Sequence, residues 1–376
     1  MSRISRELHR SLVHARAKPV DANFSRYKIF VQYLGHMFNG SSGKTQGAAA
    51  AAATKGGRRG RAAGPGRAPL STVEDCLINA ARLFVGDKGE YRNLSISSRT
   101  DAGVHAYRNC FQVDLPNKSA RLAAEGSSSS GDGAYDASQV CRGFNYFLRA
   151  SDPFPGLVAT DARRVEGGEP FDARASSTGR TYVYRLLVPS AGTGGGGSGN
   201  HFGANLFADS FSWSLPCRLD VVKMQECARL LVGEKDFSAF RGAGCQSKSP
   251  YRLVTQLEVR SVSAIEQAGG SGAFVGSSGV TSNVFVGDKD LFFLGDNDLV
   301  VITITANAFL LKMVRNIVGA LVAVGGGRLA VGDVALALES KDRLALKCEP
   351  APARGLFLHS VHYADEEQGG GTENSD

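Results

Sequence analysis

Apolar positions along the chain follow two periods, one typical of β-strands and one typical of amphipathic helices. Strand-like runs cover residues 27–34, 93–97, 107–115, 157–165, 180–188, 253–262, 291–295, 299–306 and 355–363. Helical spacing covers residues 71–84, 139–149, 221–232 and 307–324. Because these elements lack the regular crossovers of a doubly wound sheet, the pattern predicts an α+β fold of two related halves, each a sheet with helices on one face.

Three of the expected helices carry more detailed signals. Ser71 and Glu74 have the spacing of a capping box at the start of the first helix. Gly233 follows the helix at 221–232, as a glycine that ends a helix commonly does. The helix at 307–324 is apolar over most of its circumference, so we expect it to be buried against a sheet.

Four stretches rich in glycine, alanine or serine interrupt this pattern. They cover residues 43–69, 125–133, 191–199 and 267–288. Such stretches cannot bury enough apolar surface to offset the entropy lost on ordering, so we expect disordered insertions on a smaller fold. The predicted organisation is a basic N-terminal arm or presequence at 1–24, an N-terminal half at 25–166, a C-terminal half at 167–364 and a disordered tail at 365–376.

The composition is that of a globular protein, with 43% hydrophobic and 21% charged residues among 376. The formal net charge of +7 favours a polyanionic partner, although the insertions carry part of this charge. Seven cysteines without a C-x-x-C pair indicate a reduced intracellular protein rather than a disulfide scaffold or a zinc ribbon. No apolar run approaches the roughly 18 residues of a membrane helix. His359 and His362 point to opposite faces of a strand, so we expect no shared metal.

A charged pair occupies the connection between the second and third strand-like runs. Residues 97–106 read SSRTDAGVHA, which places Arg99 two residues before Asp101 and Gly103 two residues after it. Turn chemistry alone can account for this pattern, because aspartate bonds its own backbone and glycine adopts positive φ. The alternative is a functional carboxylate that a tight turn presents.

Arg315 lies in the middle of the apolar helix expected at 307–324. A buried arginine needs an anion, because an unpaired buried charge is very costly. We expect Asp101 to be its partner. The alternatives are that the guanidinium extends to the surface or binds a phosphate at the helix edge.

Two further stretches suit nucleic-acid binding, and each has an ordinary structural alternative. Tyr182 and Tyr184 lie two apart in a strand and share a face, which can stack on nucleobases or belong to a core. The loop at 236–252 is rich in basic and small residues. Such a loop suits a phosphate backbone, but it is equally typical of a solvated surface.

In chain order, these stretches resemble blocks of one family, the tRNA pseudouridine synthase A superfamily. The blocks are SRTDAGVHA at 98–106, FDAR at 171–174, RTYVY at 180–184, GCQS at 244–247, MVRNIVG at 313–319 and APARGLFL at 351–358. The resemblance covers residues 27–363 except at the insertions, and it is closest to the pseudouridine-synthase-like branch found in animal mitochondria. Turn chemistry alone is then an inadequate explanation for Asp101.

The resemblance implies two ferredoxin-like, or RRM-like, halves that share a continuous, mainly antiparallel sheet. Helices lie on one face of this sheet, and an RNA-binding cleft lies between the halves. The implied activity is that of an isomerase, which converts specific uridines to pseudouridine in an RNA. By resemblance this RNA is a tRNA, modified in its anticodon arm, and the enzyme needs no metal or organic cofactor.

The resemblance also assigns residues. Asp101 corresponds to the catalytic nucleophile, which attacks the sugar or base covalently or removes a ribose proton. Tyr182 is implied to stack on the flipped uracil. Arg99, on the same strand face as Asp101, is expected to hold a phosphate or fill the place that the uridine leaves. Arg315 completes the set of implied substrate-binding residues, and the family often forms a homodimer.

Two features of the sequence leave alternatives to this interpretation. The arm at 1–24 has several arginines and serines and only one acid, Glu7, which suits a mitochondrial presequence or a disordered basic arm of a cytoplasmic or nuclear protein. The basic stretch at 55–67 suits an RNA chaperone or a ribosome or ribonucleoprotein assembly factor that retains the fold without catalysis.

Leu34 departs from the bacterial form of the family, which usually has aspartate there.

Overall fold

The structure is a computed structural model. It describes residues 13, 16–42, 71–86, 89–118, 133–152, 155–166, 170–190, 206–262 and 297–364. The predicted insertions at 43–69, 191–199 and 267–288, the strand at 291–295 and the tail at 365–376 lie outside these ranges. The same is true of all but the last residue of the insertion at 125–133 and of most of the arm at 1–24.

The chain divides into two compact units. Unit 1 comprises Met1–Arg180 and Leu358–Asp376, and unit 2 comprises Thr181–Phe357. Two strands, β5 (Ser177–Pro189) and β10 (Leu356–Tyr363), contribute residues to both units. The predicted halves at 25–166 and 167–364 follow chain order alone, and this division stays a prediction.

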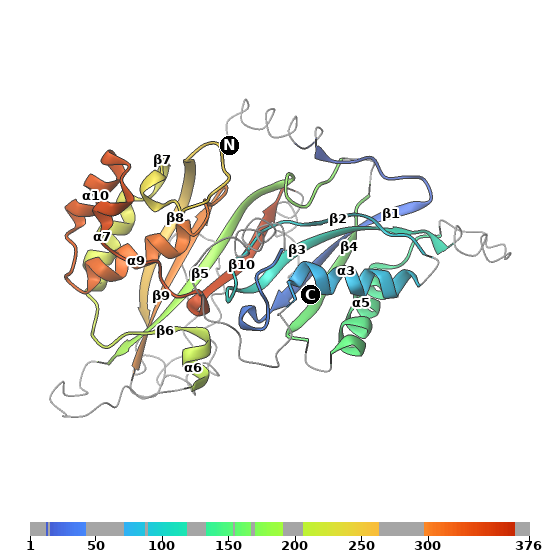
Figure 1. Cartoon of the computed structure of the whole chain (residues 1–376), viewed down its shortest axis with the longest axis horizontal. Helices are drawn as coiled ribbons and strands as arrows, with labels where there is room; N and C mark the ends of the chain where they lie inside the picture. The colour runs from blue at the N-terminus through green and yellow to red at the C-terminus, as the bar shows by residue number, and fades with distance from the viewer. Residues whose placement is uncertain are drawn as a thin grey trace, which may run out of the picture. The chain divides into compact units, whose positions relative to one another are not determined.

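Unit 1 has the element order strand, helix, two strands, helix, strand (Figure 1). The elements are β1 (Phe24–Tyr33), α3 (Val73–Val85), β2 (Arg92–Ile96), β3 (His105–Pro116), α5 (Ala137–Ser151) and β4 (Leu157–Arg164). Strand β1 pairs antiparallel with β3 and β4, and β2 pairs antiparallel with β3. The resulting strand order is β4-β1-β3-β10.

An aromatic cluster joins the two helices of unit 1 to the strands. The ring centroid of Phe144 on α5 lies 5.8 Å from that of Phe84 on α3 and 6.4 Å from that of Phe111 on β3. Phe111 and Phe144 are fully buried. Because apolar residues at helical spacing meet inward residues of the strand, both helices pack on the same core.

Helix α3 begins one residue later than the sequence predicts. Thr72 is the N-cap, because its Oγ1 accepts the N–H of Asp75 at 3.1 Å and its own N–H donates to Asp75 Oδ2 at 3.0 Å. The carbonyl of Ser71 instead accepts the N–H of Asn39 at 3.1 Å. The predicted capping box of Ser71 and Glu74 is therefore wrong, since a tertiary contact selects the neighbouring register.

Unit 2 contains most of the remaining elements. They are α6 (Leu206–Phe211), β6 (Trp213–Ser214), α7 (Val221–Leu230), β7 (Gly233–Asp236), β8 (Tyr251–Val262), β9 (Asn297–Ala306), α9 (Met313–Gly325) and α10 (Val331–Ser340). Strand β8 pairs antiparallel with β7 and β9, and the short β6 pairs parallel with β5. The strand order is β5-β9-β8-β7, and α7 packs against α9, α10 and β8 (Figure 1).

The apolar helix α9 begins at Met313, later than the predicted start at residue 307. Lys312 adopts a left-handed conformation with φ of 57°, which a right-handed helix cannot contain. The carbonyl of Leu311 accepts the N–H of Gly242 at 2.7 Å and is thus used by another segment. Arg315 therefore lies in the first turn of α9, and its predicted position in the middle of a helix is wrong.

The end of α7 also differs from the prediction. The helix ends at Leu230, with Leu231 as its C-cap. Gly233 has a φ of 103° and opens β7. The glycine thus permits the change from helix to strand a little after the helix has ended, rather than acting as the predicted cap.

The described residues confirm the predicted α+β class, with a large, mainly antiparallel sheet and packed helices. The ferredoxin-like character of the halves, the continuity of their sheet and the cleft between them stay predictions. None of the helices in the described ranges is long and apolar enough to span a bilayer.

Candidate active site

The segment at 97–104, here called the RTD turn, connects β2 to β3 and contains Asp101. The N–H of Val104 donates to the carbonyl of Asp101 at 3.1 Å, which closes a β-turn. Gly103, the third residue of this turn, has a φ of 83°. A positive φ at this position is what a type II turn requires, so the aspartate-glycine spacing has the predicted structural cause.

The last residue of β1 and the segment that follows it hold the RTD turn in place through hydrogen bonds. Tyr33 Oη and Thr100 Oγ1 are 2.9 Å apart. The N–H of Thr100 donates to Ser41 Oγ at 2.8 Å, and the N–H of Ser41 donates to the carbonyl of Thr100 at 3.2 Å. Asp101 therefore follows a residue whose backbone and side chain are both fixed.

Gly35 allows a close approach of the same segment to the far end of the RTD turn. Its carbonyl accepts the N–H of Gly103 at 3.3 Å. A Cβ atom on Gly35 would lie 2.1 Å from the carbonyl oxygen of Val104, which no side chain can accommodate. The glycine is thus needed for the backbone contact that supports the turn from this side.

Asn109 is a buried residue of β3 whose side-chain amide holds the start of the RTD turn. Its Nδ2 donates to the carbonyl of Ser98 at 2.9 Å and to Tyr33 Oη at 3.2 Å. Its Oδ1 accepts the N–H groups of Ser98 at 3.2 Å and of Cys110 at 2.9 Å. Since a buried amide with satisfied bonds has one defined orientation, Asn109 fixes the start of the turn to the sheet.

The predicted residues Asp101 and Arg99 both lie in this rigid turn. The side chain of Asp101 is half-buried, and that of Arg99 is exposed. Neither residue lies on a strand, because β2 ends at Ile96 and β3 begins at His105. The expectation that the two share a strand face is therefore wrong, and their placement follows from the turn.

The two tyrosines of the RTYVY block are both buried in unit 2. Tyr184 is fully buried, and its hydroxyl donates to the carbonyl of Pro352 at 2.8 Å, so this residue belongs to a core. Tyr182 is 7% exposed and packs edge-on against Phe309, with ring centroids 5.1 Å apart. Its predicted stacking on uracil stays a prediction.

Arg315 is held at the start of α9 in unit 2. Its Nε donates to the carbonyl of Ala351 at 2.6 Å, and its own carbonyl accepts the N–H of Ala351 at 2.9 Å. The side chain is half-buried. The positive end of the helix dipole disfavours a cation in the first turn. An anion bound there would interact favourably with both the guanidinium and the helix dipole. Its predicted pairing with Asp101 stays a prediction.

The basic loop at 236–252 uses arginines to hold its own backbone. Arg241 Nη2 donates to the carbonyls of Cys245 and Ser247, both at 2.6 Å. Arg252 Nη2 donates to Ser247 Oγ at 2.7 Å. These side chains therefore have a structural role, which the basic composition of the loop does not reveal.

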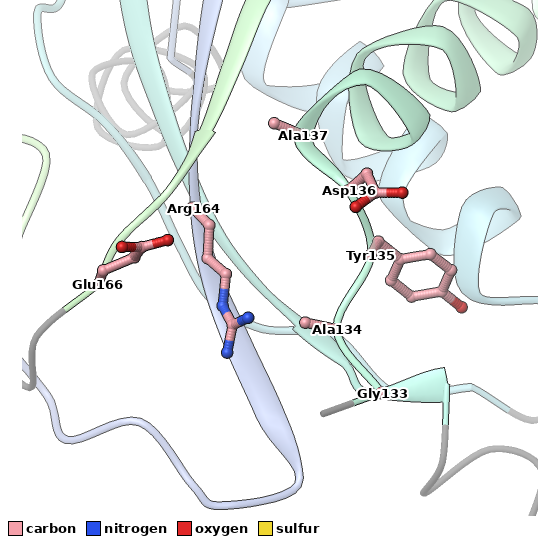
Figure 2. A pocket seen from close by; sticks show the side chains of 7 residues that line it. All are labelled: Gly133, Ala134, Tyr135, Asp136, Ala137, Arg164 and Glu166. Atoms are coloured by element: carbon pink, nitrogen blue, oxygen red, sulfur yellow. The ribbon is translucent and has the colours of Figure 1, made fainter. Parts of the chain in front are cut away.

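A pocket of about 470 Å³ lies in unit 1 where α5 begins and β4 ends (Figure 2). Its lining residues are Gly133, Ala134, Tyr135, Asp136, Ala137, Arg164 and Glu166. Arg164 and Glu166 face the start of α5 across the opening (Figure 2). None of the predicted site residues belongs to this lining.

Within the described part of the chain, no three histidine, cysteine or acidic side chains gather as a metal site would require.

The residues that support the RTD turn were not identified from the sequence. Ser41, Tyr33 and Asn109 act through hydrogen bonds between segments far apart in the chain. One signal was available for Asn109, because in the strand-like run at 107–115 it shares a face with Tyr107, Phe111, Val113 and Leu115, and a polar residue on an apolar face needs a satisfied amide. Arg174 and Arg180 belong to the FDAR and RTYVY blocks, but neither has a separate role among the predicted site residues.

Comparison with known proteins relates the chain to enzymes that modify tRNA. A family model described as tRNA pseudouridine synthase matches residues 227–364. The chain is 32% identical over 343 residues to tRNA pseudouridine synthase-like 1 of Homo sapiens, which covers 91% of each protein. The protein of the same name from Mus musculus is 32% identical over 341 residues, with 90% of this chain and 94% of the relative covered.

A bacterial protein shows similar relatedness. The tRNA pseudouridine synthase A of Acidiphilium cryptum is 30% identical over 292 residues, which cover 78% of this chain and 87% of the relative.

Proposed function

Because the chain belongs to the tRNA pseudouridine synthase family, we propose that it isomerises specific uridines of a tRNA with Asp101 as the catalytic nucleophile. Family membership makes the protein an isomerase that acts on RNA. The observation that carries the assignment of Asp101 is its position in a turn that two other segments hold rigid.

The chemistry of the reaction needs such a carboxylate. The bond between ribose C1′ and uracil N1 breaks, the base rotates, and C1′ joins C5, whose proton is lost while N1 gains one. An ionised carboxylate assists by covalent attack on the sugar or base, or by removal of a ribose proton. Either role requires a carboxylate that solvent and substrate can reach, and the half-buried Asp101 meets this condition.

We propose Tyr182, Arg99 and Arg315 as substrate-binding residues. A uridine has to leave its stack to be isomerised, at a cost of a few kcal/mol, and an aromatic ring such as Tyr182 can offset part of that cost by stacking. Arg99 is supported by its exposure next to Asp101. Arg315 is supported by its place at the positive end of a helix, where an anion is favoured.

We also infer the finer features that the family resemblance implies. Unit 1 has the order of elements of a ferredoxin-like motif, β1-α3-β2-β3-α5-β4, which supports two ferredoxin-like halves. The anticodon arm of the tRNA, a homodimer and a mitochondrial location are proposed from the resemblance to the pseudouridine-synthase-like branch. Light scattering of the purified protein tests the dimer, and fractionation of cells tests the location.

Release of tritium tests the function directly. A tRNA transcript that carries [5-³H]uridine loses tritium to water when C5 is joined to the sugar. We expect wild-type protein to release tritium and Asp101→Asn to release none, while the Kd for the transcript changes by less than about tenfold, or about 1.4 kcal/mol. Asp161→Asn is the matched control, because Asp161 is an exposed carboxylate of unit 1 paired with Arg163.

Two results would contradict the proposal, in different ways. Tritium release by Asp101→Asn at the wild-type rate would remove Asp101 from the catalytic role. Absence of release by the wild-type protein from a complete set of tRNA transcripts would contradict the proposed activity and favour an RNA-binding role without catalysis.

A further inference from the structure

Three arginines of unit 1 concentrate positive charge at the RTD turn. Arg99 belongs to the turn, and Arg180 Nη2 donates at 3.4 Å to the carbonyl of Ser97, where the turn begins. Arg174 interacts electrostatically with Arg99, Arg180 and Arg16. In the described part of the chain, neither Arg99 nor Arg174 forms an ion pair through its side chain.

The like charges of Arg99 and Arg174 repel each other. Desolvation by the surrounding protein, followed by the charges of Arg99, Arg180 and Arg16, lowers the pKa of Arg174, and the carboxylate of Asp172 opposes this only in part. An anion among the guanidinium groups would relieve the repulsion. The planar guanidinium fork matches the oxygens of a phosphate, so a phosphodiester suits this position.

The backbone that carries Arg174 is fixed in place. Gln112 Oε1 accepts the N–H of Ala173 at 2.8 Å, and Tyr363 Oη donates to the carbonyl of Ala173 at 2.7 Å. Asp172 Oδ1 accepts the N–H of Arg174 at 3.0 Å. Because the main chain is hydrogen-bonded at Ala173 and at the N–H of Arg174, the backbone from which the Arg174 side chain extends has a defined position.

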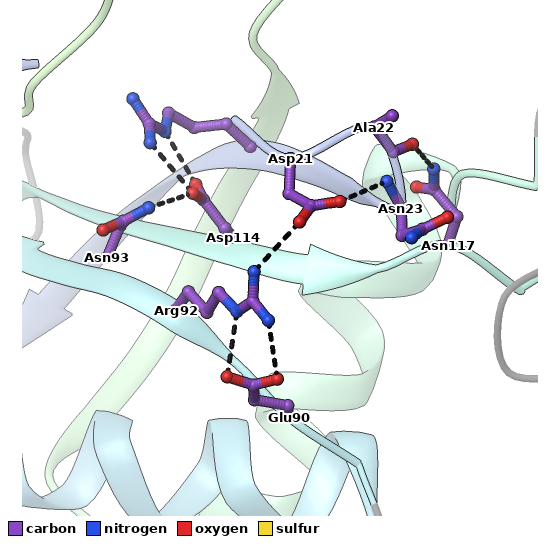
Figure 3. Close-up of polar contacts among 9 residues, drawn as sticks. Asp21, Ala22, Asn23, Glu90, Arg92, Asn93, Asp114 and Asn117 are labelled. Carbon is purple, nitrogen blue, oxygen red and sulfur yellow. Dashed lines mark hydrogen bonds and ion pairs between the residues drawn. The ribbon is translucent and has the colours of Figure 1, made fainter. Parts of the chain in front are cut away.

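A buried ion pair completes this support. Arg26 Nη1 donates to the carbonyl of Phe171 at 2.6 Å, while its Nε and Nη2 bind the two carboxylate oxygens of Asp114 at 2.6 and 2.9 Å. Asn93 Nδ2 donates to Asp114 Oδ2 at 2.6 Å (Figure 3). Arg26 is thus committed to positioning the loop that presents Arg174, and its side chain is only 2% exposed, so it does not reach a substrate.

We propose that Arg174 and Arg180, together with Arg99, form a binding site for a backbone phosphate of the RNA next to the uridine held at Asp101. This inference rests on the proposed function for the identity of the RNA. The buried residues Arg26 and Asp114 position the site, and the three arginines bind the phosphate. Phosphate contacts of this kind fix the register of an RNA without reading its sequence.

The test measures binding rather than turnover. All variants are made in the Asp101→Asn background, and the Kd for a fluorescein-labelled tRNA transcript is measured by anisotropy between about 50 and 300 mM potassium chloride. We expect Arg174→Ala to weaken binding about tenfold and to reduce the salt slope of the affinity by about one, as loss of one phosphate contact does. Arg174→Lys should restore the slope but not all of the affinity, because lysine keeps the charge and loses the fork.

Arg149→Ala is the matched control, because Arg149 is an exposed arginine on α5 of the same unit. We expect it to change the Kd by less than about twofold, as removal of a charge outside the phosphate contacts does. Equal effects of Arg174→Ala and Arg149→Ala on affinity and slope would overturn the inference. Thermal unfolding of each variant shows whether it is folded. Failure of the proposed function would appear separately, as absence of tritium release by the wild-type protein while the arginine effects on binding persist.

Discussion

Two arginines of unit 1 make the same bidentate contact with a carboxylate in opposite surroundings. Arg26 and Asp114 are 2% and 1% exposed and pair between β1 and β3, at 2.6 Å. Arg92 and Glu90 are 41% and 62% exposed and pair at 2.9 Å on the surface (Figure 3). Water screens the second pair and competes for its hydrogen bonds, whereas the first pair has only protein partners.

This difference separates structural arginines from arginines suited to a substrate. Arg26 donates hydrogen bonds to Asp114 and to the carbonyl of Phe171, and Arg92 donates to Glu90 and to Asp21. Arg174 is exposed, has other arginines around it and forms no ion pair in the described ranges. The basic composition of the chain therefore says less about RNA binding than the partners of each guanidinium do.

The largest expected effect on stability comes from breaking the buried pair on one side only. Asp114→Ala leaves the charge of Arg26 buried without a partner, so we expect the free energy of unfolding to fall by about 3–5 kcal/mol. Urea denaturation followed by circular dichroism measures this loss. The double change Arg26→Met with Asp114→Leu should recover most of it, and a double variant as unstable as Asp114→Ala would contradict the account of an uncompensated charge.

A smaller but substantial loss is expected for the buried anchor of the RTD turn. Asn109→Ala leaves the backbone N–H groups of Ser98 and Cys110 without their acceptor, which should cost about 2–3 kcal/mol of unfolding free energy. Tritium release should fall as well, because Asp101 loses support from the sheet. Full activity in a destabilised Asn109→Ala protein would show that the turn does not need this anchor.

Tyr33→Phe tests how much the single hydroxyl of Tyr33 contributes to stability. It removes one contact with Thr100 and one with Asn109, and we expect a loss of about 1 kcal/mol in the free energy of unfolding. The ring remains, so its packing against Phe38 is kept. A loss as large as that of Asn109→Ala would indicate that the phenol, rather than the amide, organises the network.

The smallest effect is expected on the surface. Glu90→Gln removes the charge that faces Arg92, and the urea midpoint should stay within the error of measurement, because solvent replaces the lost contact. The same experiment at high salt should give the same result. A clear shift of the midpoint would break the comparison, since it would mean that an exposed ion pair contributes like a buried one.

Much of the fold was predictable, because periodic burial is recorded locally. The apolar alternation at 299–306 corresponds to β9, and the helical spacing at 139–149 corresponds to α5, although both elements are slightly longer than predicted. The errors lie where another segment competes for the backbone. Ser71 bonds Asn39 and so shifts the cap of α3, and Leu311 bonds Gly242 before α9 begins.

The sequence by itself determined the α+β class, the family and the turn that carries Asp101, because apolar periodicity, turn residues and ordered motifs are properties of neighbouring residues. Only the tertiary structure decided which charges are used internally and which remain for a substrate. It pairs Arg26 with Asp114 across two strands, and it holds the residue before Arg174 against Gln112 of β3 and Tyr363 of β10. Such contacts join residues remote in the chain, and burial, which sets the strength of each charge interaction, exists only after folding.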